Sequence, residues 1–226
     1  MAIIDNSIEP SIYRPVEHWG KFLDVPIASF RAPDGRFPDL KGDFTHFILT
    51  GSEASIVERE PWADEEVAFV QDAVAQGFPV LGSCYGHQLI ALALGGAGRV
   101  RRCLQPEVGW YPIQIVEKSG LLGEKGVAFA FCSHFDETVG LGSEYRVLAS
   151  SLRCPIQAFE LTGQPVWGIQ FHPEIDMPDA RRFLQVFAEL GLPTAPVFAD
   201  ALRTEPRDSG LIRRIVRHFL AGRAVK

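Results

Sequence analysis

The amino-acid sequence predicts an α/β protein built on one open, mixed and mostly parallel β-sheet with helices on both faces. Two observations lead to this prediction. In the first hundred residues, short β-branched and aromatic runs alternate with longer amphipathic segments, as in parallel strands joined by helices. Between residues 109 and 171, short apolar runs follow one another with Gly, Pro and Ser between them, which is typical of hairpins.

The first part of the chain supplies four strands and two helices. The strands are expected at Ala2–Asp5, Pro26–Phe30, His46–Thr50 and Val80–Gly82. The clearest helix is Trp62–Gln76, whose first turn carries three acidic residues (64–66), where the helix dipole favours negative charge. A second helix begins near Tyr85 and ends at Gly95, since glycine is a common helix stop.

The second part adds five strands and two helices. The strands are expected at Gly109–Val116, Val127–Cys132, Tyr145–Ser150, Ile156–Leu161 and Val166–Phe171, and the helices at about Pro178–Leu190 and Ser209–Ala221. The segment from Gly191 to Asp208 carries three prolines and is expected to be an extended surface connection. No composition shift divides the chain, so we expect a single domain over 1–226 with a C-terminal helical extension at about 176–226.

The composition argues against several classes of protein. A chain of 226 residues with 46% hydrophobic content can bury a core without disulfides or metal. With 22 Lys and Arg against 28 Asp and Glu, the net charge of −6 argues against binding nucleic acid or an anionic membrane. The chain has no apolar run of transmembrane length, its start does not resemble a signal peptide, and its four cysteines are irregularly spaced. We therefore expect a cytoplasmic protein.

The most informative stretch reads strand, then Gly82-Ser83-Cys84-Tyr85-Gly86, then helix. This order matches the nucleophile elbow of hydrolases, with sulfur in place of oxygen. A nucleophile on such a sharp turn crowds residues two positions away, and glycine there removes the colliding side chains. A thiol at a helix N-terminus faces free N–H groups that stabilise the thiolate, and the N–H of Tyr85 suits one half of an oxyanion hole. The alternative is that Cys84 is a small buried core residue.

A cysteine nucleophile needs a base, and His172 is the best placed of the six histidines because it follows an apolar strand. Glu174, two residues on, could orient the ring and stabilise its charged form. Alternatively, His172 begins an ordinary loop and Glu174 is a solvated cap. A metal site is another reading, because His134-x-Asp136 and His172-x-Glu174 are two His-x-carboxylate pairs. That reading leaves the cysteine without a partner, so we expect no metal.

Together these motifs resemble the class I glutamine amidotransferases, above all the glutaminase domain of GMP synthetase and its free-standing relatives. The likeness covers residues 45–175, and more loosely the chain from residue 1. It is carried by the segments Ile48–Ser52, Gly82–Gln88, Glu107–Trp110, Ser133–Asp136, Ala149–Ser151, Cys154-Pro155 and Gly168–Glu174. The resemblance implies a flavodoxin-like α/β fold, and it implies that Cys84 is the nucleophile, His172 the acid and base, and Glu174 its orienter.

The resemblance also implies roles around these three residues. Gly51 and Ser52 would complete the oxyanion hole with the N–H of Tyr85. Gln88, together with His134 and Asp136, would hold the amino and carboxylate ends of glutamine. One departure is the oxyanion loop, which usually reads Gly-Gly-Pro in the family and here reads Gly51-Ser52-Glu53.

Three functions follow from this reading. The first is a glutaminase that releases ammonia from the glutamine side chain through a γ-glutamyl thioester, for a separate synthase. No P-loop or dinucleotide-binding loop is present, so we expect no cofactor and place the acceptor chemistry on another polypeptide. The second is a self-contained γ-glutamyl hydrolase or peptidase with the same triad. The third is a non-enzymatic regulatory or binding relative.

Overall fold

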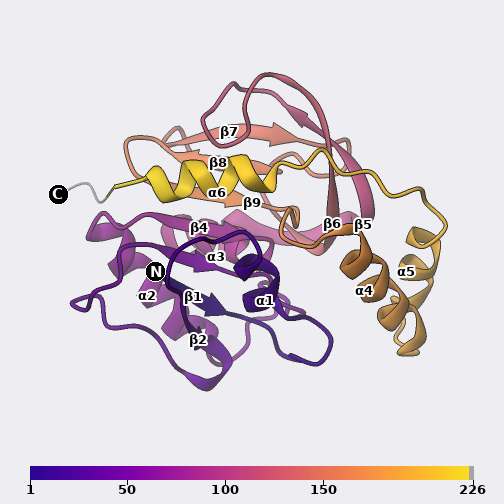
Figure 1. Ribbon diagram of the computed structural model, residues 1–226, viewed down its shortest axis with the longest axis horizontal. Coiled ribbons are helices and arrows are strands. Elements are labelled where there is room, and N and C mark those ends of the chain that lie inside the picture. The colour runs from indigo at the N-terminus through magenta and orange to yellow at the C-terminus, as the bar shows by residue number, and fades with distance from the viewer. Residues whose placement is uncertain (224–226) are drawn as a thin grey trace.

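Residues 1–223 are described by the computed structural model, and they contain one nine-stranded sheet in the order β2-β1-β3-β4-β9-β8-β7-β5-β6 (Figure 1). Its strands are β1 (Ala2–Asp5), β2 (Ala28–Arg31), β3 (Phe47–Leu49), β4 (Val80–Ser83), β5 (Val100–Ile115), β6 (Gly126–Thr138), β7 (Tyr145–Ser150), β8 (Ala158–Leu161) and β9 (Val166–Ile169). All nine predicted strands are present.

The sheet is mixed, as predicted, but its parallel part is smaller than expected. Strands β2, β1, β3, β4 and β9 pair in parallel. The pairings from β9 through β8, β7 and β5 to β6 are antiparallel. Strands β5 and β6 are longer than predicted because β5 continues through a polar stretch, with a register shift between Arg102 and Glu107. Parallel pairing therefore describes one half of the sheet.

Helices cover both faces of the sheet, because successive residues of each buried strand point to opposite sides. Ile3 of β1 packs with α1 (Pro15–Gly20) and α6 (Ile212–Ala221). Ile4, the next residue, packs with α2 (Ala63–Ala75) and α3 (Tyr85–Gly95) on the other face. Figure 1 shows α6 lying across the near face and α2 and α3 behind the sheet. No helix in the described part of the chain combines the length and apolarity needed to cross a membrane.

The prediction of an extended connection from Gly191 to Asp208 is wrong in one respect. Helix α4 (Met177–Glu189) lies close to its predicted place, but α5 (Ala195–Ala201) lies inside the segment that we expected to be extended. Pro196 stands in the first turn of α5, where the backbone N–H that proline lacks would have no acceptor within the helix. Phe198 packs the new helix against Phe183 and Phe187 of α4, and the helix pair lies beside β5 and β6 (Figure 1).

The carboxyl ends of the parallel strands meet at one edge of the sheet. Thr50 follows β3, Cys84 follows β4 and His172 follows β9. Asn6, which follows β1, is tied to this edge because its N–H donates to Thr50 Oγ1 at 2.9 Å and its side-chain amide donates to the Thr50 carbonyl at 3.1 Å. Open α/β sheets place their ligand sites at this edge, so the fold itself brings the predicted site residues together.

Candidate active site

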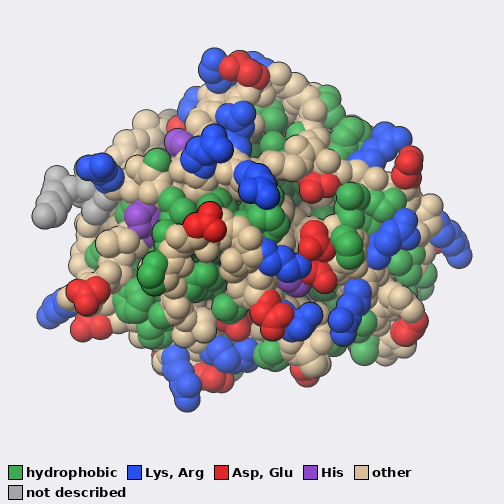
Figure 2. Space-filling view, in the orientation of Figure 1, with side chains coloured by type: hydrophobic (Ala, Val, Ile, Leu, Met, Phe, Trp, Pro, Cys, Tyr) green, Lys and Arg blue, Asp and Glu red, His purple; other side chains and the backbone are tan. Residues whose placement is uncertain are grey.

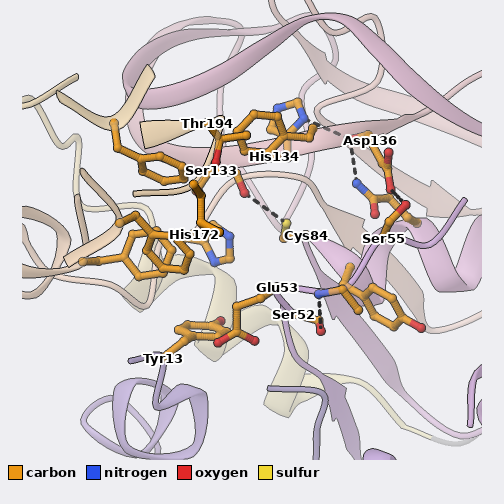
Figure 3. A pocket seen from close by; sticks show the side chains of 18 of the residues that line it. Tyr13, Ser52, Glu53, Ser55, Cys84, Ser133, His134, Asp136, His172 and Thr194 are labelled. Atoms are coloured by element: carbon orange, nitrogen blue, oxygen red, sulfur yellow. Dashed lines mark hydrogen bonds between the residues drawn. The ribbon is translucent and has the colours of Figure 1, made fainter. Parts of the chain in front are cut away.

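Cys84 stands on a strained turn between β4 and α3, with φ of 50° and ψ of −103°. A side chain at Gly82 would put Cβ 2.3 Å from the carbonyl oxygen of Gly86, and one at Gly86 would put Cβ 2.2 Å from the carbonyl oxygen of Leu49. Both glycines are thus required by close backbone contacts, as the elbow motif predicts. The Cys84 side chain is buried, and its sulfur lies 3.6 Å from the Ser133 carbonyl oxygen (Figure 3).

His172 reaches the same cavity from the end of β9. Its backbone N–H donates to the carbonyl of Phe131 in β6 at 2.8 Å, which fixes the chain where the strand has ended. Its Nδ1 lies 2.8 Å from Oε1 of Glu174, and the Glu174 side chain is fully buried. Cys84 and His172 therefore line one pocket, and Glu174 is buried behind His172, to which it is hydrogen-bonded.

The electrostatics of this group favour a charged imidazole. Burial by itself favours the neutral ring, but the Glu174 carboxylate and the neighbouring Cys84 sulfur raise the pKa of His172 to about 10. A protonated ring next to the sulfur stabilises negative charge there. The same ring holds a proton that can pass to a leaving group.

The predicted oxyanion residues Gly51, Ser52 and Tyr85 lie next to Cys84 or His172. A Cβ at Gly51 would lie only 2.7 Å from Cε1 of His172, so the loop after β3 touches the imidazole. Ser52 lines the pocket, and its hydroxyl accepts the N–H of Ala54 at 3.0 Å. Tyr85 is the first residue of α3, where backbone N–H groups have no acceptor within the helix.

The predicted substrate-binding residues lie on the other side of Cys84, near Asp136 (Figure 3). Gln88 donates its side-chain amide to the Asp136 carbonyl at 2.7 Å. The Asp136 carboxylate accepts from the Ser55 hydroxyl at 2.6 Å and from the Arg102 guanidinium at 3.1 Å. These polar groups form one connected wall, in which an arginine faces the cavity.

His134 lines the pocket, but its ring is already engaged inside the protein. Nε2 lies 3.0 Å from Oε2 of Glu107, and Nδ1 lies 3.0 Å from the Asp136 carbonyl oxygen. Glu107 also accepts from Ser151 and Gln157. Both ring nitrogens of His134 are therefore engaged within the protein, one of them with Glu107 of the paired strand β5.

The four-ligand metal reading does not match the geometry. Among residues 1–223, the one group of three or more potential ligand side chains with ligand atoms within 4.8 Å of one another consists of Glu107, Cys132 and His134. His172 and Glu174 are not part of that group, and they are paired with each other.

The sequence matches a known protein family. The model of the family "Glutamine amidotransferase class-I" matches residues 3–188. One component of the glutamine-hydrolyzing GMP synthase of Sulfolobus acidocaldarius is 37% identical over 157 residues, which are 69% of this chain and 79% of that protein. The corresponding protein of Saccharolobus solfataricus is 45% identical over 133 residues, which are 58% of this chain and 68% of that protein.

The chain belongs to the class-I glutamine amidotransferase family. A crystal structure of a glutamine amidotransferase from Methylobacillus flagellatus superimposes with a TM-score of 0.78 at 21% identity and covers 100% of this chain and 96% of its own. At that identity the likeness concerns the fold, and it confirms the flavodoxin-like α/β class. The described fold and the family membership therefore agree with the sequence prediction.

The departure of this amidotransferase from the usual oxyanion loop has a structural explanation. Glu53, which stands where the family usually has proline, accepts the N–H of Ile8 at 2.9 Å. Burial raises the pKa of the Glu53 carboxyl despite this hydrogen bond. The Glu53 side chain thus links this loop to the segment after β1. This hydrogen bond restrains the loop where a proline would restrict its backbone.

Sequence reasoning missed one polar neighbour of the catalytic candidates. Tyr13 is buried, and its hydroxyl donates to Oε1 of Glu174 at 3.1 Å, the same oxygen that His172 contacts. Its ring meets the His172 ring edge to face, with centroids 5.9 Å apart. Tyr13 lies in a short loop before α1 with no motif around it, so no local signal could have found it.

Proposed function

We propose that this chain hydrolyses the side-chain amide of glutamine through a γ-glutamyl thioester on Cys84, and that the ammonia serves a separate synthase. The observation that carries the proposal is that Cys84, on its strained elbow, and His172 line one cavity, while the buried Glu174 contacts the far side of the His172 ring. Membership of the amidotransferase family supports the same chemistry.

The proposed reaction uses the groups in sequence. The Cys84 sulfur attacks the amide carbon, and the N–H of Tyr85 with that of Gly51 or Ser52 stabilises the oxyanion, at roughly 10²–10³ in rate per donor. The C–N bond then breaks as His172 gives its proton to the nitrogen, and ammonia leaves. His172 next takes a proton from water, which attacks the thioester and releases glutamate and the thiol. Glu174 holds the ring in orientation throughout.

We place the α-amino and α-carboxylate groups of glutamine on the polar wall. The Arg102 guanidinium and the Asp136 carboxylate carry opposite charges on that wall, as a zwitterionic end requires. The Gln88 amide and the main chain at His134 complete this end of the site. The four cysteines are free, which fits the reducing, cytoplasmic setting that we propose for the protein.

A synthase partner is supported by the two archaeal relatives, each of which is named as one component of a glutamine-hydrolyzing GMP synthase. By analogy, we propose that this chain also acts with a second polypeptide that consumes the ammonia.

The proposal is tested by replacing the sulfur. We expect Cys84→Ala to abolish release of glutamate from glutamine, because the proposed reaction needs the sulfur to attack the amide carbon. Cys154→Ala is the matched control, since its thiol donates to the Ile156 carbonyl at 3.5 Å and does not line the pocket. Glutamate release at the wild-type rate by Cys84→Ala would overturn the assignment.

A further inference from the structure

The cavity that holds Cys84 extends beyond the candidate catalytic residues to the segment after Glu174. It has a volume of about 330 Å³, which is in the range of sites that enclose drug-sized ligands. Part of its lining comes from the segment after Glu174, namely Phe183, Phe187, Leu192, Thr194 and Phe198. We call this set the aromatic wall. Helices α4 and α5 supply its three aromatic rings, and Leu192 and Thr194 lie between the two helices.

The rings of the aromatic wall pack in one continuous series. Phe183 and Phe187 have centroids 4.6 Å apart, and Phe187 stacks on Phe198 at 4.9 Å. Phe198 is buried and anchors α5, whereas Phe183 and Phe187 remain half-buried, and Leu192 keeps 46% of its surface exposed at the rim. Apolar surface is therefore left open to the cavity, where a ligand could cover it.

The aromatic wall begins at the imidazole. Phe183 contacts Tyr13, with centroids 6.1 Å apart, and Phe131 at 6.0 Å. The same two rings flank His172, at 5.9 and 6.3 Å. The wall thus continues from the side of the site where His172 would deliver a proton, which is the side where a leaving group departs.

The charged end of the cavity lies on the opposite side. Figure 3 shows His172 on one side of Cys84, and Asp136 with Ser55 on the other. Arg102, whose guanidinium binds Asp136, belongs to that second side. A γ-glutamyl group bound by its charged end near Asp136 would therefore direct its amide nitrogen towards His172 and the aromatic wall.

We propose that the aromatic wall is a leaving-group subsite, which makes this chain accept γ-glutamyl amides of apolar, preferably aromatic, amines in addition to glutamine. This inference rests on the proposed function of Cys84. The bonds are those of glutamine hydrolysis: the S–C bond forms, the C–N bond breaks, and the His172 proton goes to the amine nitrogen. Water then cleaves the thioester. Only the group carried by the departing nitrogen differs.

The test compares two amides whose amines have similar basicity, γ-glutamylphenethylamide and γ-glutamylethylamide, with glutamine as a third substrate. The account predicts that kcat/KM for the phenethylamide exceeds that for the ethylamide by about tenfold or more, since a hydrophobic pocket discriminates by at least that factor for a phenyl ring. Cys84→Ala should cleave none of the three.

Two variants locate the preference. Phe187→Ala and the rim variant Leu192→Ser should each reduce the ratio of the two kcat/KM values, with Phe187→Ala bringing it to within about twofold of one. Leu192 is half exposed, so that variant tests the subsite even if Phe187→Ala does not fold. Phe44→Ala is the matched control, because Phe44 packs on Phe30 away from the pocket and its loss should leave the ratio as in the wild type.

The outcomes separate the two proposals. Cleavage of glutamine by the wild type with a phenethylamide-to-ethylamide ratio near one would overturn the aromatic subsite and leave the proposed glutaminase intact. A high ratio that both variants retain would also overturn it, since the preference would then lie elsewhere. Equal cleavage of all three substrates by wild type and Cys84→Ala would overturn both proposals.

Discussion

At the scale of single residues, the site depends on one backbone conformation that an ordinary residue avoids. Cys84 has a positive φ of 50°, and such a conformation costs of order 1–3 kcal/mol in a residue other than glycine. The packing of the adjacent strands offsets this cost, and Gly82 and Gly86 clear the space. The result presents the sulfur at the N-terminus of α3, in the pocket that His172 also lines.

Candidate site residues that belong to a local sequence motif could be predicted from the sequence. Tyr13, which contacts the site through Glu174, could not. The spacing of Gly82, Cys84 and Gly86 follows from a local steric rule, and Glu174 lies within reach of His172 along the chain. Tyr13 lies 161 positions before Glu174 in the sequence. The two are in contact only because the fold brings the loop before α1 next to the segment after β9. No pattern in the chain encodes that meeting.

Tyr13 provides a prediction at this scale. We expect Tyr13→Phe to lower kcat for glutamine hydrolysis by roughly tenfold with KM within about twofold, because a hydrogen bond to a charged group is worth about 1.5–3 kcal/mol and this one orients Glu174. Steady-state kinetics measures the effect. Tyr111→Phe is the control, since its hydroxyl contacts Arg153 instead. Identical kcat values for Tyr13→Phe and the wild type would contradict an orienting role.

At the scale of elements, the strands and helices with a clear apolar period were predicted, and those stabilised by distant partners were not. The strands β1, β3 and β4 are apolar runs buried on both faces, so their pattern is local. The first part of β5 carries charged and polar residues and is a strand because β6 pairs with it. Helix α5 is short, and it exists because Phe198 packs on α4.

Helix α2 was predicted in place, but one of its acidic residues does not face solvent. Glu66 is completely buried, whereas Asp64 and Glu65 are exposed. Burial raises the pKa of Glu66 to about 8, although the nearby Asn6 side chain favours the charged carboxylate. The helix dipole favours negative charge in this first turn, but the Glu66 side chain lies on the face of α2 that is buried against the protein.

The buried acid gives a prediction on pH. Between pH 4.5 and about 8 the unfolded chain releases the Glu66 proton and the folded chain keeps it, so the free energy of unfolding falls as pH rises, by at most about 1.4 kcal/mol per pH unit. Glu66→Gln should remove this part of the pH dependence and be more stable than the wild type at pH 8. Urea unfolding from pH 5 to 8 measures it. Glu65→Gln is the control, and a wild-type pH dependence in Glu66→Gln would refute the explanation.

At the scale of the whole molecule, one face of the sheet is covered by two helices from opposite ends of the chain, α1 and α6. Helix α6 packs Ile215 and Phe219, both fully buried, on the face that β1 and α1 share. The surface shown in Figure 2 mixes acidic and basic side chains without a large patch of one sign. Since the last helix packs on Trp167 of β9 and on His46 beside β3, we propose that the described chain folds as a single domain.

The contribution of α6 can be measured directly. We expect Phe219→Ala to lower the free energy of unfolding by about 3–5 kcal/mol, because the ring is fully buried among core residues and its loss leaves a cavity. Arg217→Ala, on the exposed side of the same helix, should change it by less than about 0.5 kcal/mol. Equal effects of the two changes would show that α6 does not belong to the core.

The central claim is that the Cys84 sulfur forms a covalent bond to the γ-carbonyl carbon. The most direct measurement is mass spectrometry of the wild-type protein after acid quenching during turnover of glutamine, with Cys84→Ser as the comparison. The account predicts a γ-glutamyl adduct on the peptide that contains Cys84. Glutamate release without any adduct on that peptide, in the wild type and in Cys84→Ser alike, would contradict it.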